Sequence, residues 1–194
     1  MPLTSRFKPL PLSSMTTAPE LPKVQRMALP HDPALSLLTD LHHSACVIAM
    51  EHDGLDETLH LMMRAGVRMV FVSGAGGELA GMVTAEDLQG ERPVVRATSG
   101  RVPHRELTVA DVMVPVTQWD TVDLATVRTA RLGDVAETMH EHGLRYLLVT
   151  QNKLGKMVLR GLFSASRLEM AMNTTIEPGL HSRSFAELEM VLAH

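Results

Sequence analysis

The sequence has little cysteine: Cys46 is the single thiol among 194 residues. One thiol excludes an intrachain disulfide framework and a zinc site built from paired cysteines. It is typical of a reducing compartment, and we expect a cytoplasmic protein. Because Cys46 lies in the apolar run 45–48, we predict that it is a small buried side chain rather than a nucleophile.

Long apolar runs, basic charge and aromatic side chains are also scarce. No apolar stretch reaches the roughly 18 residues that a membrane-spanning helix needs. The formal net charge is −4, and the aromatic residues are four Phe, one Trp and one Tyr. A chain without a basic excess and with few stacking side chains is a poor nucleic-acid binder. We therefore expect neither a membrane nor a nucleic acid as a partner.

The familiar signatures of catalysis and phosphate binding are absent as well. The chain has no P-loop, no GxGxxG after a strand, no HExxH and no GxSxG. Its ten histidines do not fall into a spacing that places three or four metal ligands together. We assign no catalytic residue, no metal ligand and no required cofactor, and a metal-dependent enzyme is the least favoured alternative.

What the sequence does contain is an internal repeat. Residues 132–143 (LGDVAETMHEHG) match residues 55–66 (LDETLHLMMRAG), and both segments have apolar side chains at helical spacing before a glycine. A strand-like run follows each segment, at 69–72 and at 147–150. The motif Gly161-x-x-Ser164 then repeats Gly81-x-x-Thr84, after a turn that is three residues longer in the second copy.

The order of these patterns predicts a β-α-β-β-α unit in each copy. Two such units pack against each other, because one alone leaves an apolar sheet face uncovered. We therefore predict an α/β (α+β) fold in which two repeats pair about a pseudo-twofold axis. A short helix at 32–42 precedes the first strand, which we predict at 45–50. Thr108 and Asp111 have the form of a capping box that starts another short helix.

The chain divides into five segments. Seven of the eleven prolines lie in residues 1–33, which we interpret as an extended tail or as a strap over the body. The first repeat covers residues 34–89 and the second covers residues 108–172. Residues 90–107 contain four arginines and form either a solvated linker or a contact for an anionic ligand or partner. Residues 173–194 include the apolar spacing of an amphipathic helix, from residue 182 onward.

The duplication, the entry 111–115 (DVMVP) and the exit 81–88 (GMVTAEDL) together resemble a tandem CBS-domain pair, also called a Bateman module. The resemblance covers about residues 35–172. It implies a protein that dimerises into a flat disc and binds an adenosine-containing ligand between the repeats. It also implies regulation rather than catalysis.

The first copy carries the residue types that a ribose needs. An ionised Asp87 only accepts hydrogen bonds and can take both vicinal hydroxyls, and Thr84 adds a hydroxyl at the start of the same helix. Free backbone N–H groups at a helix start favour anions, and Gly81 would let a ligand approach the backbone closely. The spacing of Thr84 and Asp87 also forms a capping box that needs no ligand, and this alternative stays open.

The resemblance implies further contacts in the same cleft. By it, Arg68 would face ligand phosphates, and the base would lie near Met82 and near the entry of the second copy, from Asp111 to Val116. The alternative for Arg68 is an ordinary surface or salt-bridged arginine.

The second copy departs from this pattern, because Arg167 stands where Asp87 stands in the first. An arginine donates hydrogen bonds and never accepts them, so it cannot receive ribose hydroxyls, but it can pair with a phosphate. We therefore predict one competent nucleoside cleft per chain. The second cleft is empty, a packing site, or an anion site that involves Ser164, Arg167 and Arg145.

These inferences lead to one functional expectation and one alternative. We expect a homodimeric regulatory or sensor protein that binds AMP, ADP, ATP, S-adenosylmethionine or a cyclic dinucleotide in one cleft. Binding would change the angle between repeats and so influence a protein partner that the sequence does not name. The alternative is a dimerisation or scaffold module that binds no ligand.

Overall fold

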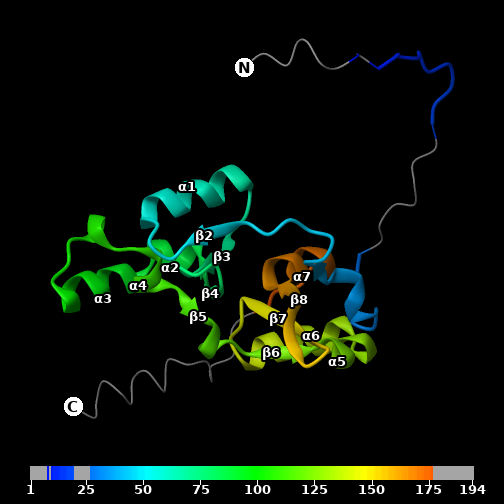
Figure 1. Ribbon diagram of the computed structural model, residues 1–194. Coiled ribbons are helices and arrows are strands. Elements are labelled where there is room, and N and C mark those ends of the chain that lie inside the picture. The colour runs from blue at the N-terminus through cyan, green and yellow to red at the C-terminus, as the bar shows by residue number, and fades with distance from the viewer. Residues whose placement is uncertain (1–7, 9, 20–26, 177–194) are drawn as a thin grey trace.

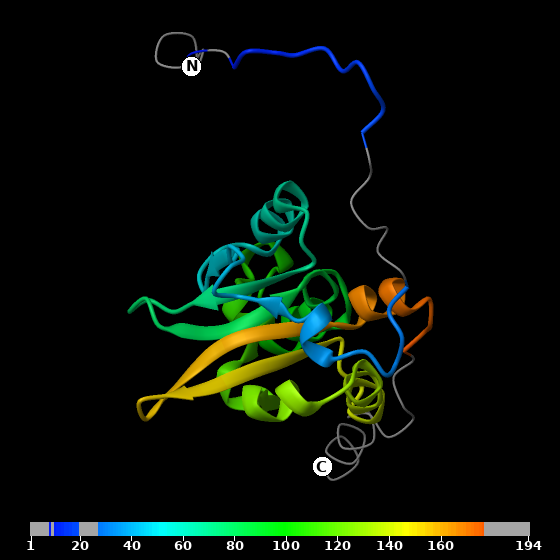
Figure 2. The ribbon, with the colours of Figure 1, turned by 90° about the vertical axis from the view of Figure 1, so that its right-hand side faces the viewer.

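The computed structural model describes residues 8, 10–19 and 27–176. Two four-stranded sheets lie at its centre, with helices packed on their outer faces (Figures 1 and 2). One sheet has the strand order β2-β3-β4-β5, and the other has the order β1-β8-β7-β6.

Each sheet follows one repeat of the sequence, with a parallel pair and an antiparallel hairpin in each. The first repeat forms β2 (Ile48–Met50), α1 (Leu55–Ala65), β3 (Met69–Ser73), β4 (Leu79–Thr84) and α2 (Ala85–Gln89). The second forms β6 (Thr121–Asp123), α5 (Leu124–Thr129), α6 (Leu132–Glu141), β7 (Tyr146–Lys153), β8 (Lys156–Ser164) and α7 (Ala165–Met172). The predicted duplication is confirmed, and α5 is a helix that the sequence analysis did not predict.

The two copies share an irregularity in the hairpin. The register of β3 with β4 shifts after Val72, and the register of β7 with β8 shifts after Val149. Each shift lies beside a glycine, because Val72 pairs with Gly81 and Val149 pairs with Gly161. Equivalent bulges at equivalent positions show that the copies have the same backbone path up to this point.

The additional residues of the second copy lengthen its hairpin rather than its loop. β7 and β8 stay paired as far as Lys153 and Lys156. Leu154 and Gly155 close the turn with φ of 53° and 80°. Two consecutive left-handed residues are typical of a two-residue hairpin turn.

Each repeat also contributes a strand to the sheet of the other. β1 (Thr39–Asp40) precedes β2 in the chain but pairs with β8, whereas β5 (Val114–Pro115) precedes β6 but pairs with β4. The short helix before each of these strands packs on the same repeat as the strand does. Ala34 of η1 (Ala34–Leu37) is buried in the core of the second repeat, and Val109 of α4 (Val109–Val112) is buried in the core of the first. The division into 34–89 and 108–172 stays a prediction about the order along the chain. In the packing, the short helix and strand at the start of each range lie on the other repeat.

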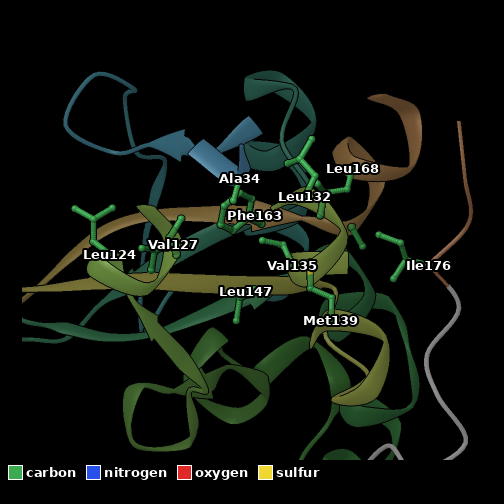
Figure 3. Close-up of a cluster of buried hydrophobic side chains, with 12 residues drawn as sticks. Ala34, Leu124, Val127, Leu132, Val135, Met139, Leu147, Phe163, Leu168 and Ile176 are labelled. Atoms are coloured by element: carbon green, nitrogen blue, oxygen red, sulfur yellow. The ribbon is translucent and has the colours of Figure 1, made fainter. Parts of the chain in front are cut away.

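Each sheet has its own apolar core under its helices. The core of the second repeat surrounds Phe163, which is completely buried, and includes side chains from η1, α5, α6 and α7 (Figure 3). The core of the first repeat contains Met62 of α1 and Val70, Val72 and Val83 of the sheet.

A third cluster joins the two sheets. Phe71 of the first sheet packs with Leu148 and Leu162 of the second, and Met69, Met82, Trp119 and Tyr146 lie against them. Because side chains alternate between the faces of a strand, Phe71 faces the other repeat while its neighbours in β3 face the helices.

Two glycines allow the exchanged strands to fit. A Cβ atom on Gly81 would lie 2.7 Å from the carbonyl oxygen of Val114, and one on Gly161 would lie 2.7 Å from the carbonyl oxygen of Thr39. Both positions therefore need glycine because a neighbouring backbone approaches them. At Gly81 the backbone that approaches closely is that of β5, and an approach by a ligand stays a prediction.

Two local predictions at the start of the first repeat need correction. The helix predicted at 32–42 is wrong, because η1 has only four residues and the chain then extends into β1, which pairs with β8. The strand predicted at 45–50 is limited to Ile48–Met50, and Cys46 lies in the loop before it.

The connector is helical, with α3 (Glu91–Gly100) and the short turn η2 (His104–Glu106). A further short turn, η3 (Val116–Gln118), follows β5. Pro93 is buried in the first turn of α3, where proline is tolerated, and Ala97 packs against the first core.

The end of the tail lies on the second repeat as a strap. The amide of Ala28 donates to the carbonyl of Ala171, and the amide of Gly133 donates to the carbonyl of Pro30. The amphipathic helix expected from residue 182 lies outside the described residues.

We expect Gly161→Ala to lower the free energy of unfolding by about 1–3 kcal/mol, because the added methyl group must displace the backbone of β1. Gly100→Ala is the matched control, since its Cβ would meet only Val102 at an ordinary 3.6 Å. Urea unfolding measures both values. Equal stability of the two variants would contradict the close packing of β1 on β8.

Candidate functional site

A cavity of about 600 Å³ lies between the repeats and draws residues from both. We call it the shared cavity, and it is lined by Arg68, Thr84, Ala85, Glu86, Gln89, Gly90, Arg145, Tyr146, Ser164 and Ser166. Several of these are repeat equivalents, because Arg68 matches Arg145 and Thr84 matches Ser164. The two copies thus place an equivalent pair of arginines and an equivalent pair of hydroxyls around a single space.

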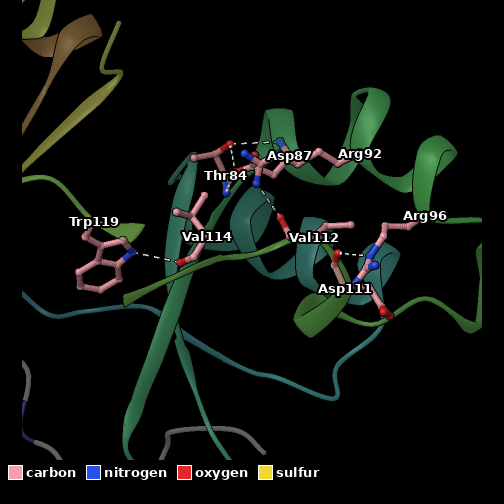
Figure 4. A network of polar contacts seen from close by, with 8 residues as sticks. All are labelled: Thr84, Asp87, Arg92, Arg96, Asp111, Val112, Val114 and Trp119. Atoms are coloured by element: carbon pink, nitrogen blue, oxygen red, sulfur yellow. Dashed lines mark hydrogen bonds and ion pairs between the residues drawn. The ribbon is translucent and has the colours of Figure 1, made fainter. Parts of the chain in front are cut away.

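Thr84 and Asp87 form the capping box that starts α2 (Figure 4). Asp87 Oδ2 accepts hydrogen bonds from the Thr84 amide at 2.9 Å and from Thr84 Oγ1 at 2.7 Å, while the Asp87 amide donates to Thr84 Oγ1 at 3.1 Å. The other oxygen, Oδ1, lies 3.3 Å from Arg92 Nη1. The carboxylate therefore has partners on both oxygens. The Thr84 side chain, which lines the shared cavity, connects it to that cavity.

The two arginines of the shared cavity differ in their partners. Arg145 Nη1 lies 3.8 Å from Glu169 Oε1 of α7. None of the described residues forms an ion pair with Arg68, and its side chain is exposed. The cavity also includes the carboxylate of Glu86. An anion with more than one negative charge fits this wall better than a neutral molecule does.

Tyr146 lies at the centre of this region and contributes to both the shared cavity and the cluster between the sheets. Burial raises the pKa of its phenol, and the positive charges of Arg145 and Arg68 act in the opposite direction. The phenol is therefore protonated at neutral pH and offers one hydrogen-bond donor.

A second cavity of about 680 Å³ opens beside Arg167 and Ser164 and includes Arg68, Tyr146, Leu162 and Cys46 among its lining residues. Arg167 Nη1 donates to Thr39 Oγ1 of β1 at 2.8 Å, and the hydroxyls of Ser164 and Ser166 lie 2.9 Å apart. The prediction that Cys46 is buried is wrong, because the loop before β2 exposes it at this cavity.

Trp119 makes the surroundings of the first repeat's hairpin differ from those of the second. Its indole Nε1 donates to the Val114 carbonyl at 3.0 Å (Figure 4). Its ring centroid lies 6.2 Å from that of Phe71. Trp119 follows Val114 of β5 by the same spacing at which Ser44 follows Thr39 of β1. In the first repeat an indole therefore lies in the same cluster as Met82. The equivalent residue of the second repeat is Ser44, which lines the second cavity.

The predicted site residues separate into two groups. Arg68, Thr84, Arg145 and Ser164 line the shared cavity, and Arg167 lines the second cavity. Five others line neither of these two cavities: Gly81, Met82, Asp87, Asp111 and Val116. Asp111 instead caps α4 by accepting from the Thr108 amide at 2.9 Å.

Two residues at the site, Tyr146 and Trp119, carried no signal in the sequence, because their positions depend on contacts between elements far apart in the chain. The sequence marks Arg92 only as one of the four arginines of residues 90–107. Within residues 8, 10–19 and 27–176, no group of three or more His, Cys, Asp or Glu side chains is placed to hold a metal ion. In the same ranges, no helix combines the length and the apolar character that crossing a membrane requires.

Comparison with known proteins identifies the fold. The family model of the CBS domain matches residues 38–92, which hold the first copy, and the second copy repeats its topology. Residues 38–92 therefore match a CBS domain, and the second copy shares the fold of the first. A search of the curated proteins found no match.

Several solved structures are similar to this chain. An uncharacterized conserved protein from Pyrococcus horikoshii is 22% identical, with a TM-score of 0.50 over 73% of this chain and 92% of that one. The CBS-pair protein CBSX2 from Arabidopsis thaliana is 19% identical, with a TM-score of 0.47 over 74% and 94%. A structure of CBSX2 in complex with AMP is 20% identical, with a TM-score of 0.48 over 72% and 95%.

The chain has one tyrosine, so its phenolate absorbance reports Tyr146 alone. We expect the titration midpoint of the folded protein to lie above about 10 and to return to about 10 in urea. Because the folded pKa is raised, the contribution of the protonated phenol to stability is complete below the unfolded pKa and is lost as pH rises through the folded pKa.

Tyr146→Phe is the control for this pH dependence, because it removes the titrating group and keeps the ring. Its unfolding free energy should fall less than that of the wild type as pH rises through this range. A folded midpoint at or below the unfolded one would contradict the burial of the phenol.

Proposed function

We propose that this CBS pair is a regulatory protein that binds an adenosine-containing ligand with phosphate groups at the shared cavity. The observation that carries the proposal is the convergence of Arg68 and Arg145, one from each repeat, on one cavity together with the hydroxyls of Thr84 and Ser164. Guanidinium groups are suited to phosphate oxygens, and hydroxyls complete the hydrogen bonding of an anion.

In this proposal the ribose lies toward Asp87. Thr84 lines the cavity, and its hydroxyl is 2.7 Å from the Asp87 carboxylate, so a ligand that enters beside Thr84 is close to an acceptor for sugar hydroxyls. The ring of Tyr146 offers the base an aromatic surface at the same cavity. Met82, Asp111 and Val116, which the resemblance assigns to the base, line neither cavity, and their contact with the base stays a prediction.

Binding at this position would change the angle between the two repeats. The cavity walls come from both copies, so a ligand that contacts Arg68 and Arg145 favours the angle that suits both contacts. We propose that this change acts on a protein partner, that the chain is a homodimer in the cytoplasm, and that its role is regulatory rather than catalytic. No cofactor is needed for this role.

A second candidate function is a dimerisation or scaffold module that binds no ligand. The observation in its favour is that both Asp87 oxygens already have partners within the protein, so the carboxylate is satisfied as a helix cap. The two candidates differ in one measurable property, because only the first predicts that an adenosine ligand changes the melting temperature.

The first test is calorimetric titration with AMP, which is present in the CBSX2 complex, and then with ADP, ATP, S-adenosylmethionine and cyclic dinucleotides. We expect binding by at least one of these, and we expect Asp87→Ala to weaken it by about 1.5–3 kcal/mol. Asp134→Ala is the matched control, because Asp134 caps α6 in the same manner and lies outside the cavity. Absence of binding by the whole series would refute the ligand-binding proposal and favour the scaffold.

A second test isolates the phosphate contact. Arg68→Ala should weaken ATP binding by about 1 kcal/mol and leave the affinity for adenosine unchanged, because adenosine has no phosphate. Arg128→Ala, which removes an exposed arginine at the end of α5, is the control. Equal losses for ATP and adenosine would place the phosphates elsewhere.

A further inference from the structure

Asp87, whose carboxylate the proposed function assigns to the ribose, forms an ion pair with Arg92. Arg92 Nη1 lies 3.3 Å from Asp87 Oδ1 and also donates to the carbonyl oxygen of Val112 at 3.1 Å (Figure 4). One guanidinium nitrogen thus connects α2, α3 and α4. We infer that Arg92 is an internal competitor of the ligand at Asp87, and that its release transmits ligand binding to α3; this inference rests on the proposed function.

The two oxygens of Asp87 have different roles in this arrangement. Oδ2 belongs to the capping box, where Thr84 supplies both a backbone and a side-chain donor. Those donors are on the same helix start, and they stay in place as long as α2 is folded. Oδ1 has a partner from another helix, so Oδ1 is the oxygen that a ligand hydroxyl can gain by exchange.

The strength of the ion pair permits this exchange. The Asp87 side chain is 15% exposed and the Arg92 side chain is 47% exposed, so solvent reaches the guanidinium but hardly the carboxylate. A partly exposed ion pair contributes little net free energy, whereas a buried carboxylate left without a donor is costly. Arg92 therefore supplies a donor on Oδ1 that a sugar hydroxyl can replace.

The connection of α3 to the rest of the molecule makes the release of Arg92 consequential. Gly90 both ends α2 and begins α3, and its amide donates to the Glu86 carbonyl at 2.7 Å. Beyond Arg92, Arg96 Nε donates to the Asp111 carbonyl at 3.1 Å. The two arginines hold α3 to the carbonyl end of α4, which leads directly into β5 and the second repeat.

A matched pair of variants tests the competition, with AMP and ATP as the probes. Arg92→Ala should bind the probes about two- to fivefold more tightly than the wild type, because the competing cation is gone. Arg96→Ala removes the neighbouring arginine, which also contacts the end of α4 but not Asp87, and should bind as the wild type does. In an Asp87→Ala background, Arg92→Ala should bring no gain. Circular dichroism establishes that each variant is folded.

Amide hydrogen exchange of residues 91–100 tests the release without relying on affinity. AMP or ATP should speed exchange of α3 in the wild type, whereas Arg92→Ala should exchange fast with or without the probe. Wild-type binding together with equal or weaker binding by Arg92→Ala overturns this inference and leaves the proposed function intact, as does an unchanged α3 in the bound wild type. Binding by Arg92→Ala alone supports a tightly closed site. Absence of binding by both proteins overturns the proposed function and this inference with it.

Discussion

The exchange of β1 and β5 between the sheets is the constraint on which the rest of the molecule depends. Each repeat lacks an edge strand of its own sheet and receives it from the other copy, at a glycine that admits the incoming backbone. Arg160 of β8 pairs with Asp40 of β1, which adds a charged contact to one of these junctions. The repeats cannot separate without opening both sheets, so the motion available to them is a small tilt rather than a dissociation. Because the walls of the shared cavity come from both copies, such a tilt changes the shape of the cavity.

Elements that depend on local patterns could be predicted from the sequence. The helix at 55–65, the strands around it and the capping boxes at Thr84 and Thr108 follow from spacing and from residue type, and the structure has them. Other features depend on distant contacts. The chain at 38–40 is extended because β8 offers it partners, and the connector is helical because α4 and the first core give α3 a surface. No pattern within those segments contains that information.

The candidate site shows the same division. The types of residue at Arg68, Thr84 and Ser164 could be selected from the repeat alone, and they line the shared cavity. Their relation to Tyr146 and Trp119 could not, because both residues lie in the cluster that joins the two sheets. The contacts of Arg92 with Asp87 and Val112 could not either, because they depend on how α3 packs against α4. The asymmetry between the copies is therefore larger than the exchange of Asp87 for Arg167. An indole lies in the same cluster as Met82 of the first repeat, whereas the equivalent position of the second repeat is Ser44, which lines the second cavity.

Trp119 is the one tryptophan of the chain, and it lies in the cluster that joins the sheets. Its indole is fixed by a hydrogen bond to the backbone just after α4 and by the ring of Phe71. Any rotation of one copy against the other alters the polarity and the quenching groups around this ring. The molecule thus contains its own optical probe of domain orientation, and its intrinsic fluorescence can follow that rotation in unlabelled protein and in real time.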